Sequence, residues 1–370
     1  MAHHRQPFEG WMPSHLERLV GIFIPARDAE VALDKLRKMK LKLDGFRFQR
    51  LGEVIGVPLV RSPSAQDERL LRIALGDFRI QETSFEPVLA RPRNLREAVR
   101  MVVPPNLLSQ LPRSLDILGD IAIIELSPKL ESYSREIGEG ILQVNPHVRL
   151  VLKKASDVTG AFRTRGLQVM AGSGGMETIH REFDCEYRLD ASSVYFNPRL
   201  AHERRRVAEQ VAMGDVVVDM FAGVGPYSIL IAKLRPDTKV YALDINPSAI
   251  EYLNENMLAN EVADRVIPML GDARVSSRNV LHGIADRVIM NLPSQAEQYL
   301  DVASHILKRA GGHIHFYRFA SRDVNLDTVR ENFEKSVYAQ RRSVRAFGFC
   351  KVIKEISPSR VQVAIDAFVE

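Results

Sequence analysis

The sequence predicts an α/β fold whose C-terminal half holds a mostly parallel sheet. Three observations predict it. Apolar runs of strand character alternate with segments of helical spacing from residue 216 onward. A glycine-rich turn joins the first of these strands to the helix after it. An aspartate closes each of the first two strands, and a Gly-Asp pair follows the third.

The glycine-rich turn is Asp-Met-Phe-Ala-Gly-Val-Gly-Pro at residues 219–226, between the apolar run 216–218 and the helical segment 227–234. Gly223 and Gly225 can adopt positive φ and let backbone N–H groups approach a ligand closely. Proline follows the second glycine, and no third glycine stands where a dinucleotide-binding helix needs one. The turn therefore favours a nucleotide-like cofactor other than NAD.

Two further strands end in a similar way. Residues 239–244 end at Asp244, about where an acidic side chain binds both hydroxyls of a ribose, and residues 265–270 precede Gly-Asp-Ala at 271–273. One such turn alone could be a structural connection. Three of them on the edge where open α/β sheets bind ligands predict a cofactor site. Together they resemble the S-adenosylmethionine site of the Rossmann-like methyltransferases.

The rest of this half completes the sheet. We expect a strand over residues 287–290, a helix over 295–309, a strand over 313–317, and a last strand pair within 337–356 and 361–368. Alternating strands and helices followed by an antiparallel pair match the seven-stranded sheet of a Rossmann-like class I methyltransferase domain.

Two smaller α+β domains are expected before this sheet. The predicted domains are residues 1–75, 92–190 and 191–370. In the first two domains the pattern of apolar residues predicts strands over 18–25, 53–60, 121–126 and 148–152 and helices over 29–39 and 129–145. A Ser/Pro-containing exit near 61–64 and several prolines from Pro87 to Pro112 indicate a linker.

Composition limits the compartment and the partners. The 370 residues include 51 Lys and Arg against 46 Asp and Glu, which permits a polyanionic partner without requiring one. Only Cys185 and Cys350 occur, so we expect reducing cytoplasm, no disulfide framework and no metal site. No apolar run approaches a membrane span, and we expect a monomer without a membrane partner. Solvated faces or phosphate contacts would explain the arginine clusters near residues 91–100, 199–206 and 341–345.

A more specific resemblance lies in Asn291-Leu292-Pro293 at the end of the fourth strand. Amino methyltransferases that act on bases commonly carry Asn/Asp-Pro-Pro-aromatic there, whereas Asn-Leu-Pro is similar to the archaeal and eukaryotic tRNA (guanine37-N1)-methyltransferases. Further blocks in that family's order are residues 194–204, 219–226, 244–247 and 311–317. The resemblance covers nearly the whole chain.

The resemblance implies methyl transfer from S-adenosylmethionine to N1 of guanosine 37 in a tRNA with G at position 37. Because N1 carries a proton, a base must remove it, and Glu203 is the candidate. The resemblance assigns Arg163 to charge developing on guanine O6. Asn291 suits the Watson–Crick edge of an extruded guanine, unless it caps the next helix. Arg199, one helical turn before Glu203, could orient that carboxylate or bind a phosphate; a surface ion pair is the alternative for Glu203.

The expected cofactor-binding residues come from the three turns, the Asn-Leu-Pro loop and the block before Glu203. Tyr195 and Phe196 in that block could also fill a domain junction. The full set is Tyr195, Phe196, Asp219, Phe221, Ala222, Gly223, Gly225, Asp244, Ile245, Asn246, Gly271, Asp272, Ala273 and Asn291.

Other reactions remain open at this point. A relative in the wybutosine pathway transfers the aminocarboxypropyl group of S-adenosylmethionine to tRNA position 37, and some members methylate a wyosine intermediate there. Asn291-Leu292-Pro293 favours methyl transfer. A second class of function is a tRNA-binding protein that keeps the fold without catalysis. The presence of Glu203, Arg163 and Asn291 argues against this alternative.

Overall fold

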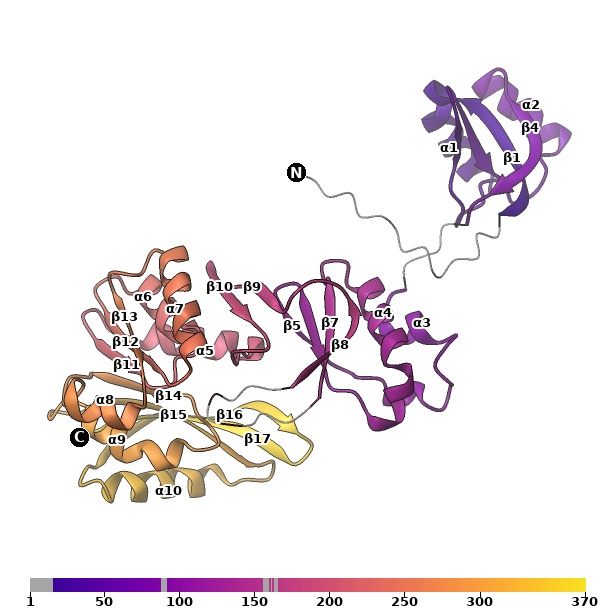
Figure 1. Cartoon of the computed structure of the whole chain (residues 1–370). Coiled ribbons are helices and arrows are strands. Elements are labelled where there is room, and N and C mark those ends of the chain that lie inside the picture. Colours follow the sequence, from indigo (N-terminus) through magenta and orange to yellow (C-terminus); the bar gives the residue numbers. More distant parts are fainter. Residues whose placement is uncertain (1–15, 88–91, 156–159, 161, 163–165) are drawn as a thin grey trace. The chain divides into compact units, whose positions relative to one another are not determined.

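The computed structural model describes residues 16–87, 92–155, 160, 162 and 166–370 (Figure 1). The chain divides into two compact units, Met1–Pro92 and Arg93–Glu370. The helices and strands of each unit follow from the local sequence and are described unit by unit.

The first unit is a four-stranded antiparallel sheet with two helices. The strand order is β2-β3-β1-β4. Ile22 and Ile24 of the central strand pack with Leu36 and Leu71 of the helices in one buried cluster. The elements are β1 (Glu17–Pro25), α1 (Ala29–Lys38), β2 (Gln49–Leu51), β3 (Val54–Pro58), α2 (Ala65–Leu75) and β4 (Arg79–Phe85), with the short helix η1 (Ala26–Asp28) before α1.

The predicted end of this domain at residue 75 is too early. Ser64, expected in a linker, is the N-cap of α2 and forms a capping box with Asp67. β4 then pairs along β1 from Glu17 to Phe23. The first unit therefore needs the strand after residue 75, whose mostly polar sequence hid it.

The second unit begins with a mixed four-stranded sheet of order β5-β6-β7-β8. β6 and β7 are parallel because α4 forms the crossover between them. The predicted strands and helix over 121–152 are confirmed; β5, β8 and the β9–β10 hairpin were not predicted. The elements are α3 (Leu95–Val99), η2 (Leu108–Gln110), β5 (Asp116–Leu118), β6 (Ile121–Ile124), η3 (Pro128–Tyr133), α4 (Ser134–Val144), β7 (Leu150–Lys154), β8 (Leu167–Gly172), β9 (Glu177–Glu182) and β10 (Cys185–Asp190).

The predicted seven-stranded sheet is confirmed, with the order β13-β12-β11-β14-β15-β17-β16. The first five strands in that order are parallel, and β17 and β16 are antiparallel to their neighbours. The strands are β11 (Val216–Asp219), β12 (Lys239–Asp244), β13 (Val266–Leu270), β14 (Arg287–Met290), β15 (Gly312–Ser321), β16 (Val344–Ser357) and β17 (Arg360–Val369).

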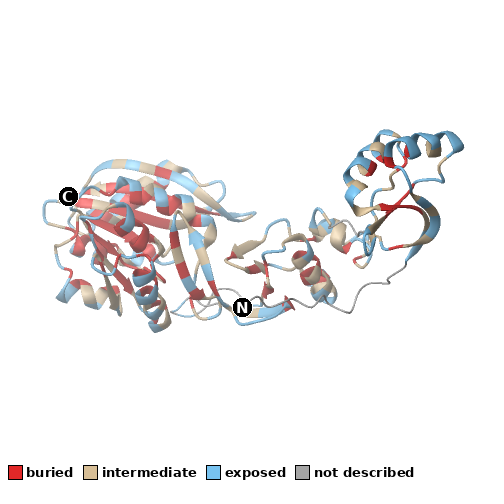
Figure 2. Cartoon of the chain, turned by 90° about the horizontal axis from the view of Figure 1, so that it is seen from above, coloured by how far each residue is buried: buried red, intermediate tan, exposed pale blue. Residues whose placement is uncertain are grey.

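Helices cover both faces of this sheet (Figure 1). Val217 packs in one core cluster and Val218 in the other, so successive residues of β11 face opposite layers. Figure 2 shows the buried residues concentrated along these strands. The helical elements are η4 (Pro198–Leu200), α5 (Ala201–Gln210), α6 (Pro226–Leu234), α7 (Pro247–Ala259), α8 (Ala273–Asn279), η5 (Ala296–Tyr299), α9 (Leu300–Ile306) and α10 (Leu326–Tyr338).

Three details of this half differ from the prediction. The helix expected over 295–309 is the shorter pair η5 and α9. Val337, expected in a strand, belongs to α10, and α8 was not predicted. The boundary predicted at residue 190 stays a prediction, because the structure joins everything from Arg93 onward into one unit. Among the described residues no helix has the length and apolar character to cross a membrane.

Asn256 of α7 connects three segments of the second unit. Its Oδ1 accepts a hydrogen bond from the Arg188 N–H (2.7 Å), and its Nδ2 donates to the carbonyls of Arg188 (3.0 Å) and Val224 (3.1 Å). The side chain is 1% exposed. It therefore satisfies backbone groups of β10 and of the glycine-rich turn that water does not reach.

We predict that Asn256→Ala lowers the free energy of unfolding by about 1–3 kcal/mol, because it leaves the buried backbone groups of Arg188 and Val224 without this hydrogen-bond partner. Asn254→Ala on the same helix is the control, since the Asn254 side chain is exposed and donates to the Ile250 carbonyl of its own helix. Urea unfolding followed by circular dichroism measures both. Equal stability of the two variants would contradict this account of Asn256.

Candidate active site and cofactor site

The two glycines of the turn do different work. Both have positive φ, 55° at Gly223 and 91° at Gly225. A Cβ on Gly225 would lie 2.4 Å from Leu253 Cδ1, so close packing requires glycine there. A Cβ on Gly223 would find only the Tyr195 carbonyl, at 3.7 Å. Gly223 therefore leaves open space beside the turn, as a cofactor held against the backbone requires.

Asp244 joins the three predicted turns. Its Oδ2 accepts the Gly223 N–H at 2.7 Å and its Oδ1 the Asn246 N–H at 2.9 Å, while its backbone carbonyl accepts the Gly271 N–H at 2.9 Å. Burial raises the pKa of the Asp244 carboxyl group. Each carboxylate oxygen can accept a second hydrogen bond, so Asp244 has lone pairs left for two ribose hydroxyls.

The third turn presents a similar opening. Gly271 has φ 146°, and a Cβ there would meet nothing within 4 Å. Asp272 is the N-cap of α8, where its Oδ1 accepts the Arg274 N–H at 2.8 Å. Ile245 is 42% exposed beside Asp244. This edge thus offers open backbone, acidic acceptors and an apolar side chain, which fit the ribose and adenine of S-adenosylmethionine.

Other predicted cofactor residues lie below this surface. Asp219 is fully buried; burial raises its pKa to about 7, and its Oδ2 accepts the Ser228 hydroxyl at 2.9 Å. Ala222 and Ala273 are also buried. The Phe221 ring meets the Tyr299 ring edge-on at 5.0 Å. In the structure Asp219 fixes the start of α6, and its contact with cofactor stays a prediction.

Tyr195 and Phe196 lie in different environments in the structure. Tyr195 is 42% exposed, and its carbonyl lies beside Gly223. The Phe196 ring packs against His180 (5.1 Å) and Tyr187 (5.8 Å), with the Arg204 guanidinium 5.0 Å from its centroid. Phe196 therefore packs against the β9–β10 hairpin, and its contact with the cofactor stays a prediction.

The side chain of Asn246 forms hydrogen bonds that hold two backbone segments together. It caps α7 by accepting the Ser248 N–H at 3.1 Å, and its Nδ2 donates to the Ser193 carbonyl at 2.9 Å. It is 4% exposed. Asn246 therefore holds the segment that carries Tyr195 beside the Asp244 turn.

Glu203 lies in a buried polar network. It is 8% exposed, and its Oε1 accepts the Tyr317 hydroxyl at 2.7 Å. The Tyr317 hydroxyl in turn accepts from Tyr227 at 3.1 Å. Burial raises the pKa of both tyrosines, so both hydroxyls are neutral donors at physiological pH. Because Tyr227 belongs to the helix after the glycine-rich turn, the network links Glu203 to the cofactor side.

Arg206 holds the same carboxylate from the other side. Its Nε donates to Glu203 Oε2 at 2.9 Å and its Nη2 to Oε1 at 2.6 Å, and it also pairs with Asp366 of β17. Burial alone would lower the pKa of Arg206, but the two carboxylates raise it overall. The guanidinium is stacked 3.9 Å from the Phe349 ring centroid.

His315 completes the cluster as a neutral ring. Burial lowers its pKa although Asp366 acts to raise it. Its Nδ1 donates to Asp366 Oδ1 at 2.7 Å, and its Nε2 accepts from Arg287 at 2.9 Å, as a neutral ring can do. The pKa of Asp366 is lowered despite its burial, by His315 and then Arg206. Site roles for Tyr317, Arg206 and Asp366 were not predicted from the sequence; of the three, only Tyr317 lies in a block that resembles the family.

The role expected for Arg199 is wrong as regards Glu203. Arg199 donates to Asp116 Oδ1 at 2.5 Å and to the Ser114 hydroxyl at 3.2 Å, whereas Arg206 orients Glu203. Arg199 lies in η4, before α5 begins, so the helical spacing assumed between Arg199 and Glu203 does not apply. Arg163 lies outside the described residues, and its role stays a prediction.

Asn291 is available for a ligand. It is half-buried at the end of β14, and its side chain makes no hydrogen bond to any described residue. The next helical segment, η5, has Gln295 as its N-cap, so Asn291 does not cap it. Met290 is paired with Phe316, which places Asn291 level with Tyr317 on the neighbouring strand. Tyr317 therefore donates a hydrogen bond to Glu203 and lies beside Asn291 on the neighbouring strand.

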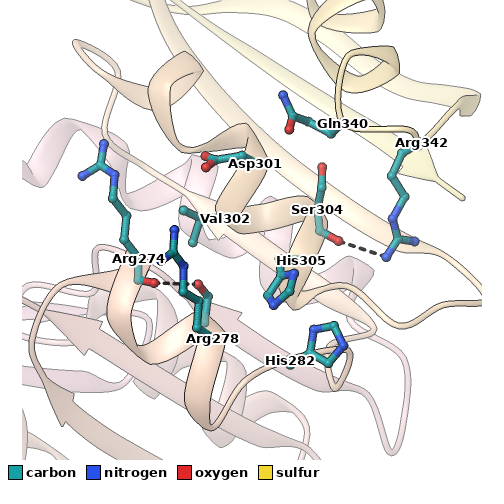
Figure 3. A pocket seen from close by; sticks show the side chains of 10 residues that line it. Arg274, Arg278, His282, Asp301, Val302, Ser304, His305, Gln340 and Arg342 are labelled. Atoms are coloured by element: carbon teal, nitrogen blue, oxygen red, sulfur yellow. Dashed lines mark hydrogen bonds between the residues drawn. The ribbon is translucent and has the colours of Figure 1, made fainter.

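A cavity that none of the predicted residues explains lies elsewhere on this domain. It has a volume of about 530 Å³ between α8, α9 and the segment after α10 (Figure 3). The His282 and His305 rings are in contact at a tilt of 41°, with centroids 4.1 Å apart, and Arg342 donates to the Ser304 carbonyl. None of the predicted site residues lines it, so size alone does not locate the predicted site.

Comparison with known proteins agrees with this geometry. The TRM5/TYW2 methyltransferase domain matches residues 178–345, and the TYW2 N-terminal domain matches residues 95–175. The tRNA (guanine(37)-N(1))-methyltransferase Trm5b of Pyrococcus abyssi is 37% identical over 94% of this chain and 98% of its own.

Two further matches bear on the substrate and on the reaction. The solved complex of aTrm5 with tRNALeu has a TM-score of 0.73 at 31% identity and covers 95% of this chain and all of its own. The tRNA(Phe) (4-demethylwyosine(37)-C(7)) aminocarboxypropyltransferase of Methanocaldococcus jannaschii is 32% identical and covers 68% of this chain and 95% of its own.

The fold and the arrangement of these turns define a class I methyltransferase that uses S-adenosylmethionine. The chain belongs to the TRM5/TYW2 methyltransferase family. The family and fold class predicted from the sequence are confirmed.

We predict that Asp244→Asn weakens S-adenosylmethionine binding at least tenfold, because an amide oxygen is a weaker acceptor and its nitrogen accepts nothing. Isothermal titration calorimetry measures the affinity. Asp264→Asn is the control, since Asp264 lies on the surface and pairs with Arg265. Unchanged affinity in Asp244→Asn would exclude ribose binding by this carboxylate.

We predict that Tyr317→Phe slows single-turnover methyl transfer about tenfold or more, because a hydrogen bond to a charged group contributes about 1.5–3 kcal/mol. Tyr241→Phe in β12 is the matched control. Thermal unfolding separates a catalytic loss from a loss of fold. If both variants react at the same rate, the Tyr317 hydroxyl does not position Glu203.

Proposed function

We propose that this protein transfers the methyl group of S-adenosylmethionine to N1 of guanosine 37 in the anticodon loop of tRNA. The observation that carries the proposal is the buried Glu203 carboxylate, held by Tyr317 and Arg206 at the edge that also bears Asn291. The near-complete match to Trm5b supports it.

Glu203 is the base of the proposed reaction. When bound, S-adenosylmethionine supplies an electrophilic methyl group on its sulfonium. Glu203 removes the N1 proton of guanine as N1 attacks that methyl group. Arg206, which pairs with both Glu203 and Asp366, fixes the orientation of the Glu203 carboxylate.

Asn291 is proposed to hold the target base. Its amide can donate to and accept from the Watson–Crick edge of a guanine extruded from the loop. Arg163 is proposed, on the resemblance alone, to stabilise negative charge on O6. These two contacts would select guanine over adenine.

The tRNA also explains the size of the chain. Flipping one nucleotide costs a few kcal/mol, which contacts far from the reacting base can offset. Arg93, Arg96 and Arg100, around α3, are candidates for phosphate contacts; Arg91 lies outside the described residues. Cytoplasmic location, a monomeric state and the choice of tRNAs with G at position 37 belong to this proposal.

Aminocarboxypropyl transfer is the main alternative. The relative with that activity covers 68% of this chain and 95% of its own length, whereas Trm5b of Pyrococcus abyssi covers 94% of this chain and 98% of its own. The longer match to a guanosine methyltransferase supports methyl transfer. The match of residues 95–175 to the TYW2 N-terminal domain means that this region does not distinguish the two reactions. Methylation of a wyosine intermediate is compatible with the same site.

The reaction product tests the proposal directly. The purified protein is incubated with labelled S-adenosylmethionine and tRNA transcripts bearing G or A at position 37, followed by digestion to nucleosides. We expect N1-methylguanosine and S-adenosylhomocysteine with the G37 transcript alone. Methylthioadenosine in place of S-adenosylhomocysteine would overturn methyl transfer in favour of the alternative.

We predict that Glu203→Gln lowers turnover by at least ~10²-fold, the typical effect of losing a general base, with tRNA affinity nearly unchanged. Glu209→Gln on the same helix is the control, because Glu209 lies on the surface and pairs with Arg205. Single-turnover kinetics and tRNA titration measure the two quantities. Full activity of Glu203→Gln would remove Glu203 from its role.

A further inference from the structure

A second cavity of about 250 Å³ adjoins the Asn-Leu-Pro loop. Residues 293–298, which continue that loop into η5, line one side. Arg318 and Phe319 of β15 and Arg360 of β17 line the other. The cavity is therefore at the same edge of the sheet as Asn291.

The cavity is anchored to the strand beside the target-base site. The Phe319 N–H donates to the Pro293 carbonyl at 3.1 Å, which ties the loop to β15. Arg318 pairs with Glu297 at 2.6 Å across it. These contacts fix the walls of the cavity relative to the loop that presents Asn291.

The walls combine an aromatic face with a cation. Phe319 is half-buried, and the Arg360 guanidinium lies 4.9 Å from its ring centroid. Arg360 is exposed and forms no ion pair within the described part of the chain. A half-buried aromatic ring beside an exposed arginine that has no ion pair among the described residues is a combination that can bind a base by stacking and a phosphate by charge, with little preference for sequence.

We propose that this pocket binds the nucleotide next to the target guanosine, with its base against Phe319 and its phosphate against Arg360. The inference rests on the proposed function, because the RNA chain joins the flipped guanosine at Asn291 to its neighbour. Holding that neighbour out of the loop stack helps to keep the target base extruded. Phe319 and Arg360 are thus binding residues for the RNA and take no part in proton transfer.

Kinetics of Phe319→Leu and Arg360→Gln test the pocket. We expect each variant to raise the KM for tRNA about tenfold, the order expected for one lost stacking or phosphate contact, with S-adenosylmethionine affinity unchanged. Arg322→Gln is the matched control, since Arg322 is an exposed arginine at the end of β15 that pairs with Glu355 and does not line the cavity. An unchanged KM for tRNA in both pocket variants would overturn the proposal that this pocket binds a nucleotide.

Transcripts that lack the base at position 36 or 38 supply a second measurement. If Phe319 stacks on that base, one of these transcripts has a raised KM with the wild-type protein, and Phe319→Leu raises it no further. A penalty for Phe319→Leu that persists with both transcripts overturns the stacking contact. A wild-type protein that methylates no G37 transcript would remove the proposed function and this pocket together, whereas normal methylation with unaffected variants removes the pocket alone.

Discussion

The active edge of the protein depends on the Arg206 guanidinium lying between Glu203 and Asp366. Both carboxylates are nearly excluded from water, and a buried charge without its partner costs about 3–5 kcal/mol. Arg206 forms an ion pair with each carboxylate and so connects α5 to β17. The orientation of α5, and with it the position of Glu203, follows from this pairing.

The same pairing fixes the orientation of the Glu203 carboxylate. Hydrogen bonds from Arg206 and Tyr317 hold both of its oxygens, while Asp366 pairs with Arg206 and accepts a hydrogen bond from the neutral His315. On the cofactor side Asp244 plays the corresponding organising part, because it gathers the Gly223 and Gly271 turns. The glycine-rich turn after β11 and Asn291 after β14 lie where the strand order reverses, the position at which open α/β sheets bind ligands.

Local signals predicted the parallel sheet, the turns and the position of Asn291, because apolar periodicity and glycine placement act over a few residues. The network could not be predicted in this way, since Arg206 and Asp366 are 160 residues apart in sequence. Arg199 was assigned to Glu203 by assuming helix where η4 precedes α5. The first domain was ended too early because β4 is mostly polar and is recognised only by its pairing with β1.

A crystal structure of the protein with tRNA and S-adenosylhomocysteine would show whether Glu203 reaches the target base. We expect a Glu203 oxygen about 2.6–3.2 Å from N1 of guanine 37, within hydrogen-bond reach, while Arg206 still bridges Glu203 and Asp366. A complex in which guanine 37 enters the pocket and Glu203 stays out of reach of N1 would contradict it.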